Sequence, residues 1–215
     1  MEKEFLINAN QLLSCIKALK PFISTEDTRY YLNGIFFELE AKSDTLNMVA
    51  TDGIKLCVLN VDVDRQELFD HGELKVIVPT AALDTMLVML KGMGDMPIAL
   101  RFNETETRMH VDTPDTKADF PLIEGDYPEY RKVIPKAKPE FIIGFGKAQA
   151  KEALKALATH SDPKDGLQWE MTDEKSPLVI RARNKLMVVM PMRVSLPGEP
   201  EFVNQDKDDK TKKKG

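Results

Sequence analysis

The sequence predicts an α+β protein built from three copies of one βαβββ unit, on two observations. First, each copy opens with a short β-type run, continues into an amphipathic helical segment and closes with three further β-type runs. Second, the copies open at Phe5, Leu74 and Phe141, which are 69 and 67 residues apart. This spacing is longer than that of the common solenoid repeats, which favours a closed or stacked assembly.

The first copy shows the pattern most clearly. Asn10 is a suitable N-cap for a helix at Asn10–Phe22, and Pro21 marks the end of its regular part. Asp52-Gly53 is typical of a tight hairpin turn. The apolar helix face comprises Leu12, Leu13, Ile16 and Leu19. Strands are predicted at Glu4–Ala9, Tyr31–Ala41, Thr45–Thr51 and Ile54–Val61.

The second and third copies repeat this order of elements. Pro79-Thr80 starts a helix at Thr80–Lys91, and Gly92 and Gly94 end it, while the third helix is predicted at Lys147–His160. The apolar face of the second helix comprises Leu83, Met86, Leu87 and Leu90. Strands of the second copy are predicted at Glu73–Val78, Pro97–Phe102, Arg108–Asp112 and Lys117–Leu122. Strands of the third copy are predicted at Leu167–Met171, Leu178–Arg183 and Leu186–Met192.

Turn signals and composition divide the chain into four segments. Residues 1–124 form a domain of two copies, and residues 140–196 form the third copy. Residues 125–139 between them are aromatic and bracketed by prolines, so we expect an ordered connector that packs. Residues 197–215 are mostly charged, and from Gln205 onwards no aliphatic residue occurs, which predicts a disordered tail.

The composition predicts a globular, cytoplasmic protein. With 215 residues, 42% of them hydrophobic, the chain can bury a sizeable core. The run Met1–Glu4 is acidic where a signal peptide would be basic, and no apolar run reaches membrane-spanning length. Cys15 and Cys57 are expected to be buried thiols without a redox or metal-binding role.

Charge is distributed unevenly along the chain. The net charge is −5, yet the three predicted helices together carry +4, which leaves −9 on the strands and loops. Lysines line many solvated helix faces, so a single basic helix would indicate little. In the third helix, however, Lys147, Lys151 and Lys155 recur every four residues and form one basic stripe, which suits phosphate contacts.

The sequence lacks a pattern typical of catalysis. The three histidines, His71, His110 and His160, are not spaced to form a nucleophile-base pair or a metal site, and we expect them on the surface. Gly144–Lys147 departs from the phosphate-loop motif, and Asp62–Asp64 is more typical of a solvated strand end than of a metal site. We therefore predict a protein that is not an enzyme and that uses no metal or cofactor.

Four ordered segments resemble the bacterial sliding clamp family, the beta subunit of DNA polymerase III. They are Arg29–Gly34, Val49–Leu56, Tyr127–Pro135 and Val188–Arg193. The resemblance spans about Glu4 to Val194. Copies one and two resemble the middle domain of the family, and copy three resembles the second half of its last domain. The resemblance implies a DNA-clamp fold, in which helices lie on one face of antiparallel sheets and line a ring around duplex DNA.

The resemblance also implies two kinds of functional residue. The helix lysines would face the DNA backbone without reading its sequence; they are Lys17, Lys20, Lys91, Lys147, Lys151 and Lys155. A pocket on the outer rim would bind short linear motifs of DNA polymerase, clamp loader and repair proteins. Its matching residues are Leu32, Thr51, Gly53, Lys55, Leu56, Pro128, Lys132, Val133, Val188, Val189, Met190, Pro191, Met192 and Arg193.

Residue types in the last of these segments suit a peptide groove. Pro191 lacks the amide that a central strand needs, so its strand should lie at a sheet edge, and Met190 and Met192 adapt to varied apolar anchors. The alternative is that Val188–Val194 is simply a core strand. Both readings place its valines at least partly inside the protein.

Compared with the family, the chain has three units instead of six. If a ring needs about twelve units, about four chains would close it, with the third copy completed by another subunit, so we expect a homo-oligomer. The shortened architecture also suggests a phage or mobile element. The tail could cover the pocket, or Lys212–Lys214 could contact DNA, or it could be inert. The alternative function is a clamp mimic that does not encircle DNA and sequesters clamp-binding proteins.

Overall fold

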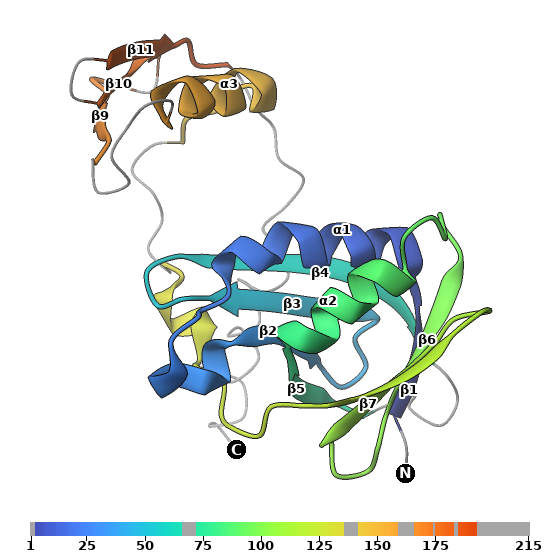
Figure 1. Ribbon diagram of the computed structural model, residues 1–215. Helices are drawn as coiled ribbons and strands as arrows, with labels where there is room; N and C mark the ends of the chain where they lie inside the picture. The colour runs from blue at the N-terminus through green and yellow to red at the C-terminus, as the bar shows by residue number, and fades with distance from the viewer. Residues whose placement is uncertain are drawn as a thin grey trace, which may run out of the picture. The chain divides into compact units, whose positions relative to one another are not determined.

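The computed structural model describes residues 3–65, 72–135, 142–158, 166–173, 175–182 and 185–192. The chain divides into two compact units, Met1–Val133 and Ile134–Gly215. In Figure 1 the first unit runs from blue to yellow, and the second is orange to red. Within the described ranges, no helix combines the length and the hydropathy of a membrane span.

The first unit contains two α-helices, α1 (Ala9–Leu19) and α2 (Thr80–Met89), each preceded by one strand and followed by three. Short 3-10 helices occur at Lys20–Phe22 (η1), Asp27–Leu32 (η2) and Tyr130–Val133 (η4). The strands are β1 (Lys3–Asn8), β2 (Gly34–Leu39), β3 (Thr45–Thr51), β4 (Leu56–Arg65), β5 (Leu74–Pro79), β6 (Pro97–Phe102), β7 (Arg108–Asp112) and β8 (Lys117–Pro121).

These strands form one antiparallel sheet in which the two copies exchange their opening strands. The strand order is β5-β2-β3-β4-β1-β6-β7-β8. The opening strand β1 pairs with β6 of the second copy, and β5 pairs with β2 of the first. A bridge between Ile77 in β5 and Ile123 just after β8 brings the two ends of the sheet together. Neither copy is therefore complete by itself.

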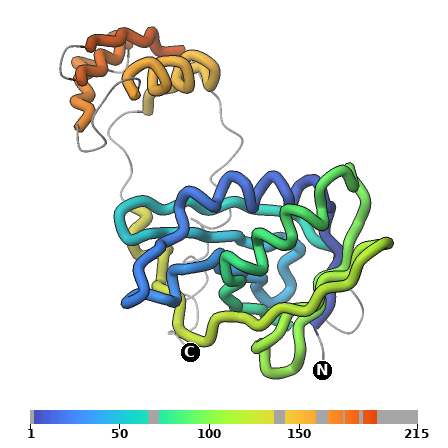
Figure 2. The backbone as a smooth tube through the Cα atoms, in the orientation of Figure 1, coloured from blue at the N-terminus to red at the C-terminus, as the bar shows by residue number. Residues whose placement is uncertain are grey.

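Both helices lie side by side across one face of this sheet, as Figures 1 and 2 show. Their apolar residues and the inward residues of the strands form a single buried cluster. Of the predicted helix positions, Leu12, Ile16 and Leu19 are completely buried in α1, whereas Leu87 of α2 is only partly buried. The clamp-type α+β fold with helices on one face of an antiparallel sheet is thus confirmed.

The described residues of the second unit form one helix and one three-stranded sheet. Helix α3 spans Lys147–Ala158, and the sheet order is β11-β10-β9. The core consists of Ala153, Leu157, Leu178, Ile180, Ala182 and Val189. The strands are β9 (Gln168–Glu170), β10 (Leu178–Ala182) and β11 (Lys185–Val189).

The predicted threefold repetition is visible in the backbone. In each copy, the residue three positions before the helix pairs with the closing segment of the same copy. The pairs are Leu6 with Asp64, Ile77 with Ile123, and Gly144 with Met192. The helices begin at Ala9, Thr80 and Lys147, so the copies are offset by 71 and 67 residues rather than by the predicted 69 and 67.

Several predicted boundaries are wrong for local reasons. The strand predicted from Tyr31 begins at Gly34, because Asp27–Leu32 forms the 3-10 helix η2. Strand β4 continues to Arg65 instead of ending at Val61, since its second half pairs with β1. The last strand ends at Val189, so Pro191 and Met192 follow it, and Met192 keeps only one bridge to Gly144. The predicted third opening at Phe141 lies outside the described residues.

The N-cap of α1 is Asn8, not the predicted Asn10. The Asn8 side-chain oxygen accepts a hydrogen bond from the Gln11 amide at 3.0 Å, and its amide donates to the Asp95 carbonyl at 3.1 Å. Asn10 is an exposed residue of the first helical turn. The sequence pattern placed the cap two residues too late, because either asparagine can end a strand and start a helix.

Replacing the true cap should therefore cost more than replacing the predicted one. We expect Asn8→Ala to lower the free energy of unfolding by about 1 kcal/mol, because the Gln11 amide loses its partner. Asn10→Ala is the matched control and should change it by less than about 0.5 kcal/mol. Urea unfolding followed by circular dichroism measures both, and equal losses would contradict this assignment.

Candidate functional site

The predicted DNA-facing lysines of the first unit lie on or next to its helices. Lys17 of α1 and Lys91, two residues after α2, are exposed. Lys20, in η1, forms an ion pair with Asp84 of α2, with both side chains partly exposed. Lys20 therefore joins the two helices, and part of its charge is offset by a carboxylate.

The helix of the second unit carries its lysines opposite its buried side. Ala153 and Leu157 of α3 pack into the core of this unit. Lys147, Lys151 and Lys155 are exposed. Residues four apart lie on one face of a helix, so these side chains form a continuous basic stripe. Glu152 is also exposed, and it lies outside this four-residue series.

The connector covers the sheet face that lies opposite the helices. Strand β2 is buried along its entire length. Phe37 packs in the core, and its neighbours Phe36 and Glu38 point to the opposite face of the sheet. The Tyr127 ring stacks on Phe36 with centroids 4.6 Å apart and an interplanar angle of 2°. The Tyr130 hydroxyl donates to Glu38 Oε2 at 2.6 Å. The prediction of a packed connector is confirmed for this segment.

Glu38 is the buried charge that fixes the connector. Arg131 donates from Nη1 to Glu38 Oε1 and from Nη2 to Glu40 Oε1, each at 2.8 Å. Burial alone would raise the pKa of Glu38, but hydrogen bonds from Arg131 and Tyr130 and the Arg131 charge outweigh it, and this pKa is lowered. The pKa of Glu40 is raised, because burial dominates there over the attraction of Arg131.

The hairpin turn between β3 and β4 is held by its own side chains. Asp52 Oδ1 accepts hydrogen bonds from the Ile54 and Lys55 amides at 2.9 and 3.0 Å. Bonds from the Lys55 side chain and from these amides lower the pKa of Asp52. Gly53 has a φ of +89°, and a Cβ there would lie 2.3 Å from Arg29 Nη1. The positive φ therefore favours glycine at this position, beside the Arg29 side chain of η2.

Three segments of the first unit thus meet at one place: η2, the β3–β4 turn and the connector. Arg29 of η2 reaches the turn at Gly53, and the connector residue Gly125 lies against Tyr30 and Tyr31 of η2. Exposed apolar side chains occur on all three segments. These are Tyr30, 54% exposed, Ile54, 95% exposed, and Val133, 69% exposed. This combination of a rigid backbone and exposed apolar groups is typical of a binding surface.

The predicted pocket residues of the first unit come from these segments or adjoin them, with different exposures. Leu32 is buried, Thr51 and Leu56 are partly buried, and the others are exposed. Thr51 is a structural member of the turn, because its hydroxyl donates to the Lys55 carbonyl at 2.7 Å. The exposed ones are Gly53, Lys55, Pro128, Lys132 and Val133.

The remaining predicted pocket residues belong to the second unit. In β11, Val189 is buried and Val188 is 49% exposed, so the valines divide between the core and the surface. Met190 and Met192 beyond the strand are 66% and 52% exposed, and Pro191 between them is partly buried. Strand β11 is an edge strand of its sheet. Arg193 lies outside the described residues.

Sequence reasoning missed the residues that position this site. Glu38, Tyr130 and Arg131 fix the connector, and Asp52 fixes the turn. A usable signal was the charged residue in the middle of a strand of aromatic and aliphatic residues, because a buried carboxylate requires a partner. The location of that partner 93 positions later in the chain was not visible in the sequence.

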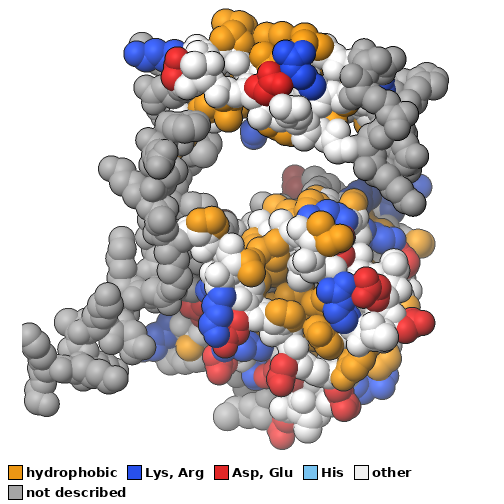
Figure 3. All heavy atoms as spheres, turned by 90° about the vertical axis from the view of Figure 1, so that its left-hand side faces the viewer, with side chains coloured by type: hydrophobic (Ala, Val, Ile, Leu, Met, Phe, Trp, Pro, Cys, Tyr) orange, Lys and Arg blue, Asp and Glu red, His pale blue; other side chains and the backbone are white. Residues whose placement is uncertain are grey.

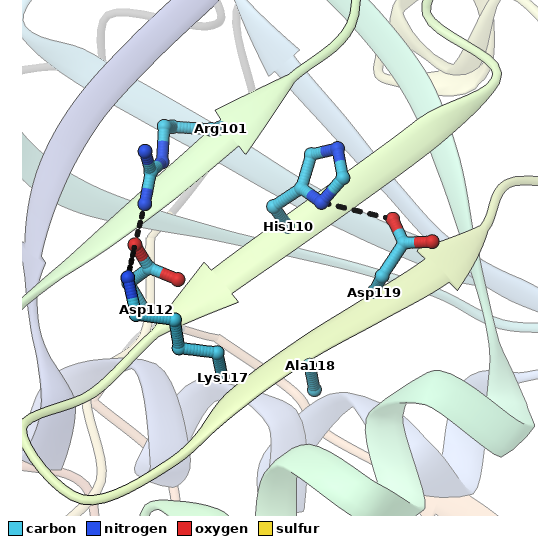
Figure 4. A pocket seen from close by; sticks show the side chains of 6 residues that line it. All are labelled: Arg101, His110, Asp112, Lys117, Ala118 and Asp119. Carbon is cyan, nitrogen blue, oxygen red and sulfur yellow. Dashed lines mark hydrogen bonds and ion pairs between the residues drawn. The ribbon is translucent and has the colours of Figure 1, made fainter.

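Separately from this surface, a hollow with a volume of about 340 Å³ lies on the outer side of β6–β8. Figure 4 shows that its charged groups are paired with one another. Arg101 and Lys117 both contact Asp112, and His110 Nδ1 lies 3.0 Å from Asp119 Oδ1. His110 is thus a surface residue as predicted, while His71 and His160 lie outside the described residues. This hollow has no serine, threonine or cysteine among its lining residues.

The two cysteines are free thiols and are partly buried, whereas buried thiols were predicted. Burial raises the pKa of both thiols, and the proximity of Cys57 raises that of Cys15 further. Among the residues described, no cluster of three or more histidine, cysteine or acidic side chains could hold a metal ion, and Asp62 and Asp64 are exposed.

The fold and the chemistry of its faces define a clamp-type protein, and comparison with known proteins gives the family. The family model of the DNA polymerase III beta subunit, central domain, matches residues 6–129. The beta sliding clamp of Escherichia coli K12 is 34% identical over 167 residues, which cover 76% of this chain and 42% of that protein. This chain therefore belongs to the family of bacterial beta sliding clamps, and it spans about half the length of the curated relatives it matches.

Solved structures support the same fold. The beta sliding clamp of C. crescentus superimposes with a TM-score of 0.73 at 23% identity, covering 87% of this chain and 50% of that one. The sliding clamp of Bartonella birtlesii, solved bound to griselimycin, gives a TM-score of 0.61 at 21% identity over 89% of this chain and 66% of that chain. At these identities the likeness establishes the fold alone.

The Arg131 contacts predict a large and pH-dependent effect on stability. We expect Arg131→Met to lower the free energy of unfolding by about 3 kcal/mol at neutral pH, because it leaves the Glu38 carboxylate buried without a counter-charge. Lys132→Met is the matched control, since that side chain is 76% exposed. Its effect should be smaller than about 0.5 kcal/mol.

The pH dependence follows from the lowered pKa of Glu38. A carboxylate with a lowered pKa in the folded state stabilises the protein above its unfolded pKa, near 4.5, and this contribution is lost as the pH falls through the folded pKa. Urea unfolding between about pH 3 and pH 7 should therefore show the difference between wild type and Arg131→Met shrinking in acid. A difference independent of pH would contradict the role of Glu38.

Proposed function

We propose that this chain acts as a sliding clamp that holds duplex DNA by encirclement and recruits DNA polymerase, clamp loader and repair proteins through a peptide-binding site. The observation that carries the proposal is the separation of chemistry between the two faces of the fold. Lys17 and Lys91 are carried on or beside the helices, on one face of the sheet, and in the first unit the candidate peptide surface is built around the turn and connector. DNA passing along the helices would leave that surface accessible.

The proposed DNA contacts are non-specific. Lys17, Lys91, Lys147, Lys151 and Lys155 are exposed. Long lysine side chains place a point charge near phosphate without fixing a geometry, which suits a protein that must move along DNA. Lys20 would contribute less, because it shares its charge with Asp84. Encirclement requires several subunits or domains, so we include a homo-oligomeric assembly in this proposal.

In the first unit the peptide site would use the exposed apolar groups of the turn and connector, and the second unit offers the exposed side chains of Met190 and Met192. Methionine side chains are flexible and polarisable, so they can accommodate different apolar anchors. The fixed backbone of the turn and the Glu38–Arg131 contacts reduce the ordering that binding requires. A site of this kind binds short linear motifs from several partners.

Retention on circular DNA tests the encirclement. The protein, loaded on nicked circular DNA, should remain bound and be released when the circle is linearised, because a ring slides off a free end. Glu substitution of all three stripe lysines, Lys147, Lys151 and Lys155, should abolish retention. The slope of the logarithm of the binding constant against the logarithm of the salt concentration should also become less negative, by about 0.9 for each lost phosphate contact.

A matched control is the triple variant Lys75→Glu, Lys117→Glu, Lys175→Glu, which makes the same change of charge at exposed lysines outside the helices. It should retain DNA like the wild type. Equal losses in both triple variants would contradict the helix assignment. Binding that survives linearisation would exclude encirclement and would favour a clamp mimic.

Griselimycin is a suitable probe for the peptide site, because the Bartonella birtlesii clamp was solved with it bound. We expect binding to this chain, measured by calorimetry, with an affinity at least about tenfold lower for Met192→Ala and for Leu56→Asp. Met96→Ala is the control, because Met96 is 45% exposed on a loop before β6. Unchanged affinity in Met192→Ala and Leu56→Asp would exclude the proposed pocket.

A further inference from the structure

The three copies can be aligned residue by residue through their strand register. The bridges described above make Asp64, Ile123 and Met192 equivalent. Three residues earlier in each copy, Val61 pairs with Leu46, Phe120 with Met109, and Val189 with Leu178. Two residues further along the middle strand, Met48 pairs with Phe37, Val111 with Leu100, and Ile180 with Trp169. Trp169 is therefore the counterpart of Phe37 and Leu100.

These counterparts differ sharply in burial. Phe37 and Leu100 are both 0% exposed, whereas Trp169 is 51% exposed. The same holds for the two inward positions that flank them along the strand. Ile35, Leu39, Ile98 and Phe102 are between 0% and 1% exposed, but their counterparts Leu167 and Met171 are 39% and 43% exposed. The third copy thus presents a row of three large apolar side chains that both other copies bury.

The first unit shows what buries this row. The free edge of β2 is covered by β5, the opening strand of the other copy, and the edge of β6 is covered by β1. Strand β9 occupies the corresponding place at the end of the three-stranded sheet, and in the part of the chain that the structure describes its second edge has no partner. Figure 3 shows hydrophobic side chains over much of the visible surface of this unit.

The third copy also has an opening segment that could serve as such a partner. Residues 142–146 precede α3, and among the described residues they pair with the closing segment through the bridge from Gly144 to Met192, as β5 pairs with its own closing segment through Ile77 and Ile123. In the first unit the opening strand pairs on both sides, with β4 and with β6. The third copy therefore offers a donor segment and an acceptor edge. Within the described residues, each of them lacks a neighbouring strand on one side.

We propose that the second units of two chains pair about a twofold axis, each placing its opening segment against β9 of the other. In the first unit, a local pseudo-twofold axis relates the two repeats that exchange strands. In the proposed dimer, a true twofold axis would relate the third repeats of two chains. A second molecule of this chain is the occupant that fits, because it supplies both a donor segment and an acceptor edge. The two exchanged pairs would correspond to β1 with β6 and to β5 with β2 in the first unit. The proposal does not depend on DNA binding.

The register of the first unit predicts the contacts. Ile7 lies opposite Ile98 and Val78 opposite Ile35, which places Phe145 opposite Leu167 of the other copy. Phe5 lies opposite Leu100 and Val76 opposite Phe37, which places Ile143 opposite Trp169. Both predicted pairs are apolar, and the intervening Gly144 would lie opposite Gln168 on the outer face. Apolar groups therefore meet on the inner side only, as in the first unit.

The single tryptophan of the chain gives a direct measurement. We expect the mass of the full-length protein, followed by light scattering between about 1 and 100 µM, to rise from that of one chain at least to that of two. Tryptophan emission should shift to shorter wavelength over the same range, because Trp169 becomes buried. Met171→Lys keeps the tryptophan and should abolish both changes. Met96→Lys, at a comparably exposed methionine of the first unit, should abolish neither.

Cross-linking tests the register. In a background with Cys15→Ser and Cys57→Ser, the double variant Ile143→Cys, Trp169→Cys should form a disulfide between chains under mild oxidation, whereas Gly144→Cys, Trp169→Cys should not. A protein that stays monomeric with unchanged emission would overturn the proposal, and so would an oligomer that Met171→Lys leaves intact. Burial of Trp169 only on addition of a separate beta sliding clamp would show that the occupant is a different chain, which also overturns it.

Discussion

The exchange of opening strands between repeats is the constraint on which the rest of this structure depends. A single βαβββ unit leaves one edge of its second strand uncovered, together with the apolar side chains behind that edge. In the first unit, β5 covers β2 and β1 covers β6, so Phe37 and Leu100 become fully buried. The burial of these side chains, at roughly 25 cal/mol per Å² of apolar surface, favours pairing of the repeats over separate folding.

The same arrangement separates the two proposed functional surfaces. Because both helices lie on one face of the sheet, their lysines gather on that side, and the other face remains available for the connector. There Arg131 and Tyr130 satisfy Glu38, a carboxylate that would otherwise be buried without a partner. The connector lies against η2 at Gly125, and Arg29 of η2 lies close to Gly53 in the β3–β4 turn. The proposed peptide surface of this unit depends on these contacts.

Sequence periodicity located regular elements well and irregular ones poorly. The bounds of β3, β6 and β7 agree with prediction, because alternating side chains on a half-buried strand give a clear signal. η2 was predicted as part of a strand, because Tyr31 and Leu32 belong to an apolar run whose local conformation depends on packing against the turn. Similarly, the cap of α1 was predicted at Asn10, whereas Asn8 caps the helix and also donates to the Asp95 carbonyl.

By itself the sequence determined the three repeats, the fold class, the family and the lysine stripe of α3, because these rest on local periodicity and on motifs that are continuous in the chain. The tertiary structure decided which strands exchange, that Lys20 is paired with Asp84, and that Glu38 is held by a residue far along the chain. It alone revealed that Trp169 is exposed where its counterparts are buried. These features arise from contacts between distant segments, and such contacts leave no periodic signal in the sequence.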